Sequence, residues 1–201
     1  MKSRVLFGLF VWLCVVANVS ASPIITVGDW FLEPNTAGQR IQLFAVGTDL
    51  VTGFNLRAQI GDGMGGNPEP IFQSIDFSGG IWDAHPYTVM GGPIMGHEQY
   101  AQASVVFNNK GDAVVANGLI ATLVIDTTGI FFDGTLELNK RGIFDLKLAG
   151  TDIGQDSEFI VTGGNLLRVD IANGRITVPE PASMVLLGLG GLVLTCRRRR
   201  A

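Results

Sequence analysis

Four side chains that could bind a metal or transfer protons fall within one short stretch of the sequence: Asp83, His85, His97 and Glu98. Imidazole together with carboxylate suits zinc or manganese, and the matching function is a secreted hydrolase with its site in residues 61–100. The spacing of the four residues fits no ligand template, and polar residues on a loop are the commoner origin of such a set. We therefore predict no metal, no cofactor and no catalytic residue, and keep the hydrolase as the alternative.

Three aromatic residues in the same stretch, Trp82, Tyr87 and Tyr100, are candidates for a ligand surface. Exposed aromatic rings beside polar side chains can stack on sugar rings. Aromatic side chains also bury large areas and so hold a loop against the core of a domain. We favour this second role and keep the ligand surface as the alternative.

Other catalytic signatures are missing from the sequence. It has no G-x-S-x-G motif, and its two cysteines, Cys14 and Cys196, lie near the ends of the chain. The sequence GDGMGG at 61–66 fits G-x-G-x-x-G, but a dinucleotide site needs a helix directly after the glycines. Pro70 follows instead and cannot sit inside a helix. The sequence thus indicates a protein that is not an enzyme.

The elements that must position these residues alternate apolar and polar side chains with a period of two, which is typical of half-buried strands. Such segments occur at 40–47, 53–61, 135–139, 144–148 and 165–178, whereas 118–126 is apolar on both faces, which is typical of a central strand. In the last of them, Asn173-Gly174 predicts a tight hairpin turn. Many short strands separated by turn residues predict an all-β fold, a jelly-roll-like antiparallel β-sandwich.

Residues 61–100 depart from this alternation. They are rich in glycine and proline, and only 71–77 resembles a strand. We expect an irregular excursion here, of the kind that carries function or varies freely.

The first 21 residues have the features of a secretory signal peptide. Lys2 and Arg4 precede an apolar run, and Val19 and Ala21 are small residues at the positions that a signal peptidase reads. The alternative is a retained membrane anchor, for which the apolar run is short. We predict an N-terminal signal helix at 1–21 that is removed after Ala21, leaving a domain at 22–178.

The C-terminal residues have the features of a membrane anchor. Residues 182–196 carry no charge, and as a helix they would span about 22 Å, against about 30 Å for a hydrocarbon core. The run ends in four arginines that favour the cytoplasmic side and can reach outward to the headgroups: Arg197, Arg198, Arg199 and Arg200. The sequence predicts a C-terminal transmembrane helix in the tail 179–201, with the domain outside the cell.

Pro179-Glu180-Pro181, the apolar run and the arginine cluster together resemble a PEP-CTERM protein-sorting domain. The resemblance covers 178–201. It implies that Pro179, Glu180 and Pro181 are the recognition motif for an exosortase and that the arginines are the stop signal. It also implies an inner-membrane precursor, removal of the tail near this motif, and delivery to the cell surface or extracellular matrix of bacteria that make extracellular polysaccharide.

The order of strand-like segments in 24–178 resembles that of cohesin-like and related carbohydrate-binding-like β-sandwiches. The segments IITVGDWFL, GQRIQLFAVG, VTGFNLRAQIGDG, GLIATLVIDTTG and ANGRITV carry this resemblance. In cohesins the strand corresponding to 53–60 leads into a Tyr-Asp motif, and here Ile60-Gly61-Asp62 stands in its place. The resemblance implies a binding module and transfers no binding residue.

Charge limits the partners of the domain. Residues 22–178 contain eight basic and 17 acidic side chains, a net charge of −9, which does not suit nucleic acid or anionic lipid. Both cysteines lie outside the domain, which therefore has no internal disulfide. We expect an exported, non-catalytic surface or matrix protein whose domain has a structural or binding role toward polysaccharide or a surface protein.

Overall fold

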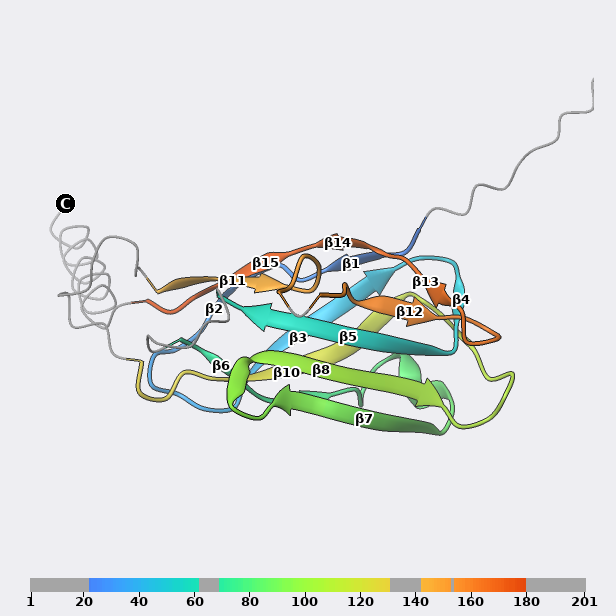
Figure 1. Cartoon of the computed structure of the whole chain (residues 1–201), viewed down its shortest axis with the longest axis horizontal. Helices are drawn as coiled ribbons and strands as arrows, with labels where there is room; N and C mark the ends of the chain where they lie inside the picture. Colours follow the sequence, from blue (N-terminus) through green and yellow to red (C-terminus); the bar gives the residue numbers. More distant parts are fainter. Residues whose placement is uncertain (1–21, 62–68, 131–141, 153, 180–201) are drawn as a thin grey trace, which may run out of the picture.

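The computed structural model describes residues 22–61, 69–130, 142–152 and 154–179. In this part of the chain, two β-sheets pack face to face (Figure 1). This confirms the predicted β-sandwich. The predicted signal helix, the transmembrane helix and the strand at 135–139 lie outside the described residues.

The smaller sheet, sheet A, has five strands in the order β14-β1-β3-β10-β6. Strand β10 lies between β3 and β6, and its side chains are largely buried on both faces, as the apolar segment at 118–126 predicts. The strands of sheet A are β1 (Ile24–Thr26), β3 (Gln39–Val46), β6 (Ile71–Asp76), β10 (Gly118–Asp126) and β14 (Asp170–Ala172).

The larger sheet, sheet B, has eight strands. Strand β5 is its centre: β8 pairs along one side of β5, whereas β12 and β11 share the other side. The strands of sheet B are β2 (Asp29–Phe31), β5 (Gly53–Ile60), β7 (Tyr87–Ile94), β8 (His97–Phe107), β11 (Ile143–Lys147), β12 (Glu158–Ile160), β13 (Leu166–Leu167) and β15 (Gly174–Thr177). A short ribbon of β4 (Leu50–Val51) and β9 (Val114–Val115), and the 3₁₀ helix η1 (Ile81–Ala84), complete the described elements.

The core lies between the two sheets and follows the alternation in the sequence. Strand β3 contributes Ile41, Leu43 and Ala45, and strand β5 contributes every second residue from Phe54 to Ile60. Because neighbouring residues of a strand point to opposite faces, the intervening polar residues face outward. Most strand pairs are antiparallel, but β1 with β14 and β15 with β2 are parallel.

The hairpin predicted at 165–178 is wrong. Strand β14 joins sheet A beside β1, whereas β15 joins sheet B between β11 and β2. The side chain of Asn173 accepts hydrogen bonds from the N–H groups of Leu148 and Ala149 at 2.8 and 3.2 Å. At Gly174 the backbone passes directly over Gly28. These contacts carry the chain from one sheet to the other in place of a turn.

The irregular excursion predicted at 61–100 is wrong for residues 87–100, whereas its strand-like piece at 71–77 is confirmed by β6 and residues 62–68 lie outside the described part of the chain. Residues 87–107 form a long hairpin of β7 and β8. Among the described strands β7 pairs with β8 alone, so it is an edge strand, where glycine and proline are tolerated. Gly91 has a φ of 87°, and a Cβ there would lie 2.3 Å from the Gln102 carbonyl oxygen, so the hairpin requires a glycine.

Candidate functional site

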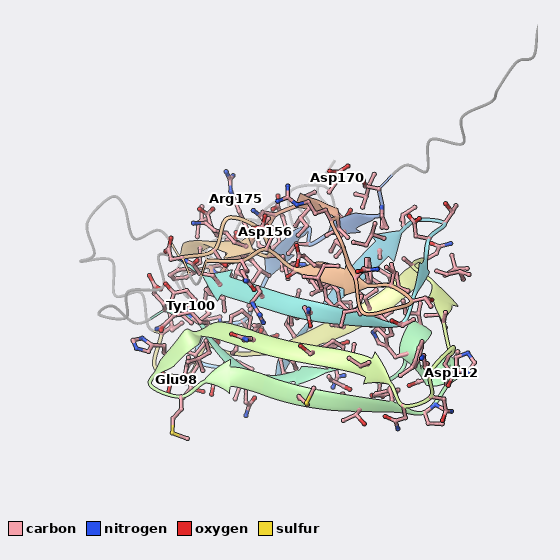
Figure 2. The ribbon with its side chains drawn as sticks, turned by 45° about the vertical axis from the view of Figure 1, so that its right-hand side comes forward. Glu98, Tyr100, Asp112, Asp156, Asp170 and Arg175 are labelled. Atoms are coloured by element: carbon pink, nitrogen blue, oxygen red, sulfur yellow. The ribbon has the colours of Figure 1, made fainter. Side chains whose placement is uncertain are left out.

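The structure separates the four residues that could have formed a metal site. His85 lies before β7 and contacts Asp112, with Nδ1 3.7 Å from Oδ1, whereas His97 and Glu98 begin β8 at the other end of the hairpin. Figure 2 shows Asp112 and Glu98 at opposite ends of β7 and β8. Eight residues of strand span about 26 Å, so these side chains cannot share one ion. Among the described residues, no group of three or more His, Cys, Asp or Glu side chains is placed to hold a metal.

Trp82 belongs to the core rather than to a ligand surface. Its side chain is fully buried, its Nε1 donates to the Ile120 carbonyl oxygen at 2.6 Å, and its ring packs against Phe107 and Phe159. The role of holding the segment to the core is therefore confirmed for Trp82, and the ligand-surface alternative is wrong for this residue.

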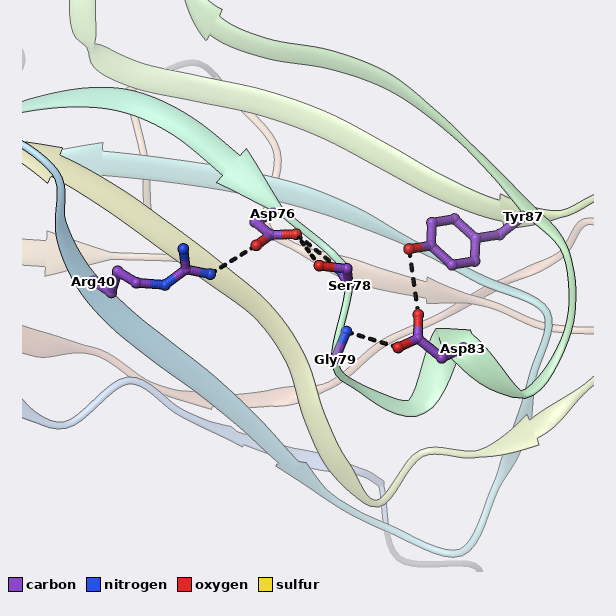
Figure 3. A network of polar contacts seen from close by, with 6 residues as sticks. All are labelled: Arg40, Asp76, Ser78, Gly79, Asp83 and Tyr87. Atoms are coloured by element: carbon purple, nitrogen blue, oxygen red, sulfur yellow. Dashed lines mark hydrogen bonds and ion pairs between the residues drawn. The ribbon is translucent and has the colours of Figure 1, made fainter.

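Tyr87 is held beside η1 by a polar network (Figure 3). Its hydroxyl group lies 3.4 Å from Oδ1 of Asp83, whose other carboxylate oxygen accepts from the N–H of Gly79 at 2.7 Å. Partial burial, together with the nearby Asp83 carboxylate, raises the pKa of Tyr87. The ring is half-buried and packs against the core, so it helps to close the domain and offers little stacking surface.

The same figure shows a second carboxylate that ties β6 to β3. The hydroxyl and the N–H of Ser78 donate to Oδ1 of Asp76 at 2.6 and 2.9 Å, and Nη2 of Arg40 lies 2.7 Å from Oδ2. The hydrogen bonds from Ser78, together with Arg40, hold the pKa of Asp76 below its ordinary value. Each carboxylate of the network is engaged in holding the fold together.

Tyr100 lies on the outer face of sheet B, where the register places it opposite Gln59 of β5. Continuing along the two strands, Gln102 lies opposite Arg57 and Ser104 lies opposite Asn55. Opposite residues of paired strands point to the same side of a sheet. We call the surface formed by Asn55, Arg57, Tyr100, Gln102 and Ser104 the Arg57 face.

Amide groups hold the guanidinium of Arg57 in place on this face. The Gln102 side chain takes the orientation in which its oxygen accepts from Nη1 and Nη2 of Arg57 at 2.9 and 3.2 Å. The Gln155 oxygen lies 3.4 Å from Nη2, a longer and weaker contact. Among the described residues, no carboxylate oxygen lies within 4.0 Å of this guanidinium. Arg57 therefore presents a fixed, unneutralised positive charge.

Segment 148–157 fixes the strand below Arg57. The Ser157 hydroxyl accepts from the backbone N–H of Arg57 at 2.8 Å and donates to its carbonyl oxygen at 2.9 Å. It thereby fills the gap between β12 and β11, which pair with the two ends of β5. The buried amide of Gln59 exchanges hydrogen bonds of 2.8 and 2.9 Å with Asp152. Strand β5 is thus hydrogen-bonded to β8 along one edge and to Ser157, β11 and β12 along the other.

The sequence contains only part of the signal for this face. The alternation in β5 already assigns Asn55 and Arg57 to its polar side. The sequence does not indicate that β8 pairs with β5, because the first residues of β8 fall within the segment predicted to be irregular. The remaining predicted sites are outside the described residues: the cleavage-site residues Val19 and Ala21, Glu180, Pro181 and the arginine cluster. Pro179 is half-buried and directly follows the buried Val178.

Comparison with known sequences decides the nature of the tail. Residues 177–200 match the PEP-CTERM protein-sorting motif. The match confirms the sorting tail predicted from the sequence, and a PEP-CTERM tail indicates export and sorting by an exosortase. A search of curated protein sequences gives no match. Within the part of the chain that the structure describes, no helix is long and apolar enough to cross a membrane.

Comparison with solved structures finds cohesins. A type I cohesin–dockerin complex from Clostridium thermocellum aligns with a TM-score of 0.56 at 11% identity, over 82% of this chain and 98% of the other. The third ScaC cohesin of Acetivibrio cellulolyticus, in complex with the ScaB dockerin, aligns with a TM-score of 0.54 at 11% identity, over 78% and 99%.

A non-cellulosomal cohesin from the archaeon Archaeoglobus fulgidus gives a TM-score of 0.51 at 12% identity, over 79% of this chain and 91% of the other. At such low identity these likenesses show the fold alone. The part of the chain that precedes the PEP-CTERM motif has a cohesin-like β-sandwich, as the order of its strand-like segments predicts.

Proposed function

We propose that this protein is exported, sorted to the cell surface by an exosortase, and acts there as a non-catalytic module that binds another protein through its Arg57 face. The sorting motif supports the destination. The cohesin-like fold supports a binding role, since two of the similar structures are cohesins bound to dockerins. The wide separation of Asp83 and His85 from His97 and Glu98 removes the support for the hydrolase.

The unneutralised charge of Arg57 carries this proposal. Neutral amides leave the charge of Arg57 unbalanced, and a carboxylate of a partner can accept from the guanidinium in place of the Gln102 or Gln155 oxygen. The domain as a whole has a net charge of −9, and Arg57 is the one charged side chain among the five residues of this face. A partner with an acidic side chain opposite Arg57 would bind in one orientation, because charge complementarity determines the register of an interface.

A protein suits this surface better than a polysaccharide does. Of the three candidate aromatics, Trp82 is buried and Tyr87 is occupied in the η1 network. Tyr100 alone remains on the Arg57 face, with its ring centroid 6.5 Å from that of His97. Arginine and tyrosine are enriched among the residues that dominate the binding energy of protein interfaces, and the Arg57 face contains both.

Arg57→Gln is expected to weaken binding to the partner by tenfold or more, on the order of the cost of losing a charged interface contact. Glutamine retains length and hydrogen bonding while it removes the charge. Surface proteins of the producing bacterium would be passed over the immobilised full chain, and the affinity of the captured protein would be measured for each variant.

The matched control is Arg175→Gln, which lies on the outer face of the same sheet but is paired with Asp145 at 3.8 Å. We expect it to bind like the unchanged protein. Equal affinity of all three forms for the captured partner would contradict a role for the Arg57 face.

Processing of the tail gives a separate prediction. The protein isolated from the cell surface should end near Pro179–Pro181, with the apolar run and the arginines removed, as mass spectrometry of the C-terminal peptide would show. Pro179→Ala combined with Pro181→Ala should leave the uncleaved precursor in the inner membrane. Surface protein that retains Arg197–Arg200 would contradict the proposed sorting.

A further inference from the structure

The last strand of the domain ends between two exposed apolar side chains. Thr177 of β15 pairs with Phe31 of β2 on one side and with Ile143 of β11 on the other. These three side chains therefore form a row across the outer face of sheet B, which we call the exit row. Phe31 is 78% exposed and Ile143 is 53% exposed. Isolated apolar residues are common on surfaces, but two that flank the point where the chain leaves the domain require an explanation.

The backbone at this point is fixed rather than loosely tethered. The N–H of Leu32 donates to the Thr177 carbonyl oxygen at 2.9 Å, and the N–H of Val178 donates to the Gly142 carbonyl oxygen at 2.6 Å. The Val178 side chain is fully buried. The folded domain therefore extends to the residue directly before the sorting motif and leaves no flexible linker.

The distance from the exit row to the apolar run of the tail is short. Four residues lie between Thr177 and Ala182, so the Cα atoms of these two residues are at most about 17 Å apart. A helix over residues 182–196 would span about 22 Å, about 8 Å less than a hydrocarbon core of about 30 Å. A run that is too short draws its flanking residues toward the bilayer. While the tail is in the membrane, the exit row lies within about 17 Å of the start of the apolar run.

The outer face at this end of sheet B changes from apolar to charged between two neighbouring rows of side chains. The next row inward from the exit row is charged and consists of Asp29, Arg175 and Asp145. Met95, in the turn between β7 and β8 at the same end of sheet B, is 96% exposed. Figure 1 shows β2, β11 and this turn reaching the same side of the domain. Apolar side chains at the rim with a charged row behind them suit the interface of a zwitterionic lipid, because the row has two aspartates against one arginine.

We propose that Phe31 and Ile143 insert into the lipid interface of the inner membrane as long as the sorting tail is uncleaved. This inference rests on the anchoring of the tail in the proposed function. The contact orients the precursor with the β2–β11–β15 end against the bilayer. Removal of the tail releases the domain, because two side chains alone give too little buried area for stable membrane binding.

The test uses the full chain, with Cys14→Ser and Cys196→Ser, reconstituted into vesicles of phosphatidylcholine alone. An environment-sensitive dye is attached through Phe31→Cys, Ile143→Cys or, as a control, Leu50→Cys. Leu50 is 59% exposed and precedes the start of β5, at the opposite end of the domain (Figure 1). We expect the emission at positions 31 and 143 to shift to shorter wavelength and to be quenched by spin-labelled lipid, and we expect neither effect at position 50.

A second variant separates insertion from mere proximity. With the dye at position 143, Phe31→Ser should reduce lipid quenching, whereas Leu50→Ser should leave it unchanged. Equal quenching at positions 143 and 50, or no effect of Phe31→Ser, would overturn the lipid contact. If the chain still resisted carbonate extraction from the vesicles, the membrane anchor would stand. An emission shift that appears only with membranes of the producing cells would indicate a protein contact and would also overturn the lipid contact. If carbonate removed the chain from the vesicles, the tail would not be a membrane anchor, and both the anchor and the lipid contact would be overturned.

Discussion

Trp82→Ala is expected to lower the free energy of unfolding by about 3–5 kcal/mol, the range for removing a large aromatic side chain from a core. The indole is fully buried and packs against Phe107 of β8 and Phe159 of β12. Its loss leaves a cavity and also removes the donor to the Ile120 carbonyl oxygen, which lies 2.6 Å from Nε1. Urea unfolding monitored by circular dichroism would measure the change.

Two further variants define what Trp82 does. Trp82→Phe should cost less, about 1–3 kcal/mol, because it leaves mainly the Ile120 carbonyl oxygen unpaired. Phe31→Ala, at a ring that is 78% exposed, should change stability by no more than about 0.5 kcal/mol. If Trp82→Ala unfolded like the unchanged protein and lost binding to a glycan, the residue would belong to a ligand surface after all.

Gly174→Ala is expected to be at least as damaging, with a loss above about 4 kcal/mol or failure to fold. A Cβ at this position would lie 1.8 Å from the carbonyl oxygen of Gly28 and 2.7 Å from its carbonyl carbon. Both obstacles are backbone atoms, so no side-chain rotation can relieve the overlap. Relief would require β15 to move away from the first residues of the domain, which would disturb its pairing with β11 and β2.

The matched control is Gly92→Ala in strand β7. A Cβ there meets no atom within 4 Å, and its φ is not positive. Soluble expression and thermal unfolding of both variants should show a folded Gly92→Ala protein and a Gly174→Ala protein that is unfolded or strongly destabilised. Similar unfolding temperatures for the two variants would contradict the close approach of β15 to Gly28.

The sequence predicts the strands of the core well, because period-two alternation directly reflects which side chains are buried. Ile41, Leu43 and Ala45 of β3 show this most clearly. The alternation does not say which sheet a strand joins. Strands β14 and β15 read as one hairpin around Asn173, yet long-range contacts to Leu148 and Gly28 send them to different sheets. Local turn chemistry was outweighed by tertiary packing.

The candidate site was predicted less well, for a related reason. Glycine and proline in 87–94 suggested a loop, but an edge strand needs hydrogen bonds on one side only and tolerates both. Because the sequence does not predict this hairpin, it does not predict that β8 pairs with β5 beside Arg57. The polar side of β5 is then indistinguishable from an ordinary solvated face. Asp83, His85, His97 and Glu98 lie close together in the sequence, but the length of the hairpin separates Asp83 and His85 from His97 and Glu98.

Site-specific photo-crosslinking on intact cells would test whether the sorted domain binds a protein through the Arg57 face of sheet B. A photoreactive residue would replace Met90, which lies opposite Ser104 at the border of this face and is 61% exposed, or Val46 on the outer face of sheet A, which is 63% exposed. We predict crosslinks to a surface protein from position 90, their loss when Arg57→Gln is added, and none from position 46. Crosslinks from position 46 alone, or from neither position, would contradict binding of a protein through the Arg57 face.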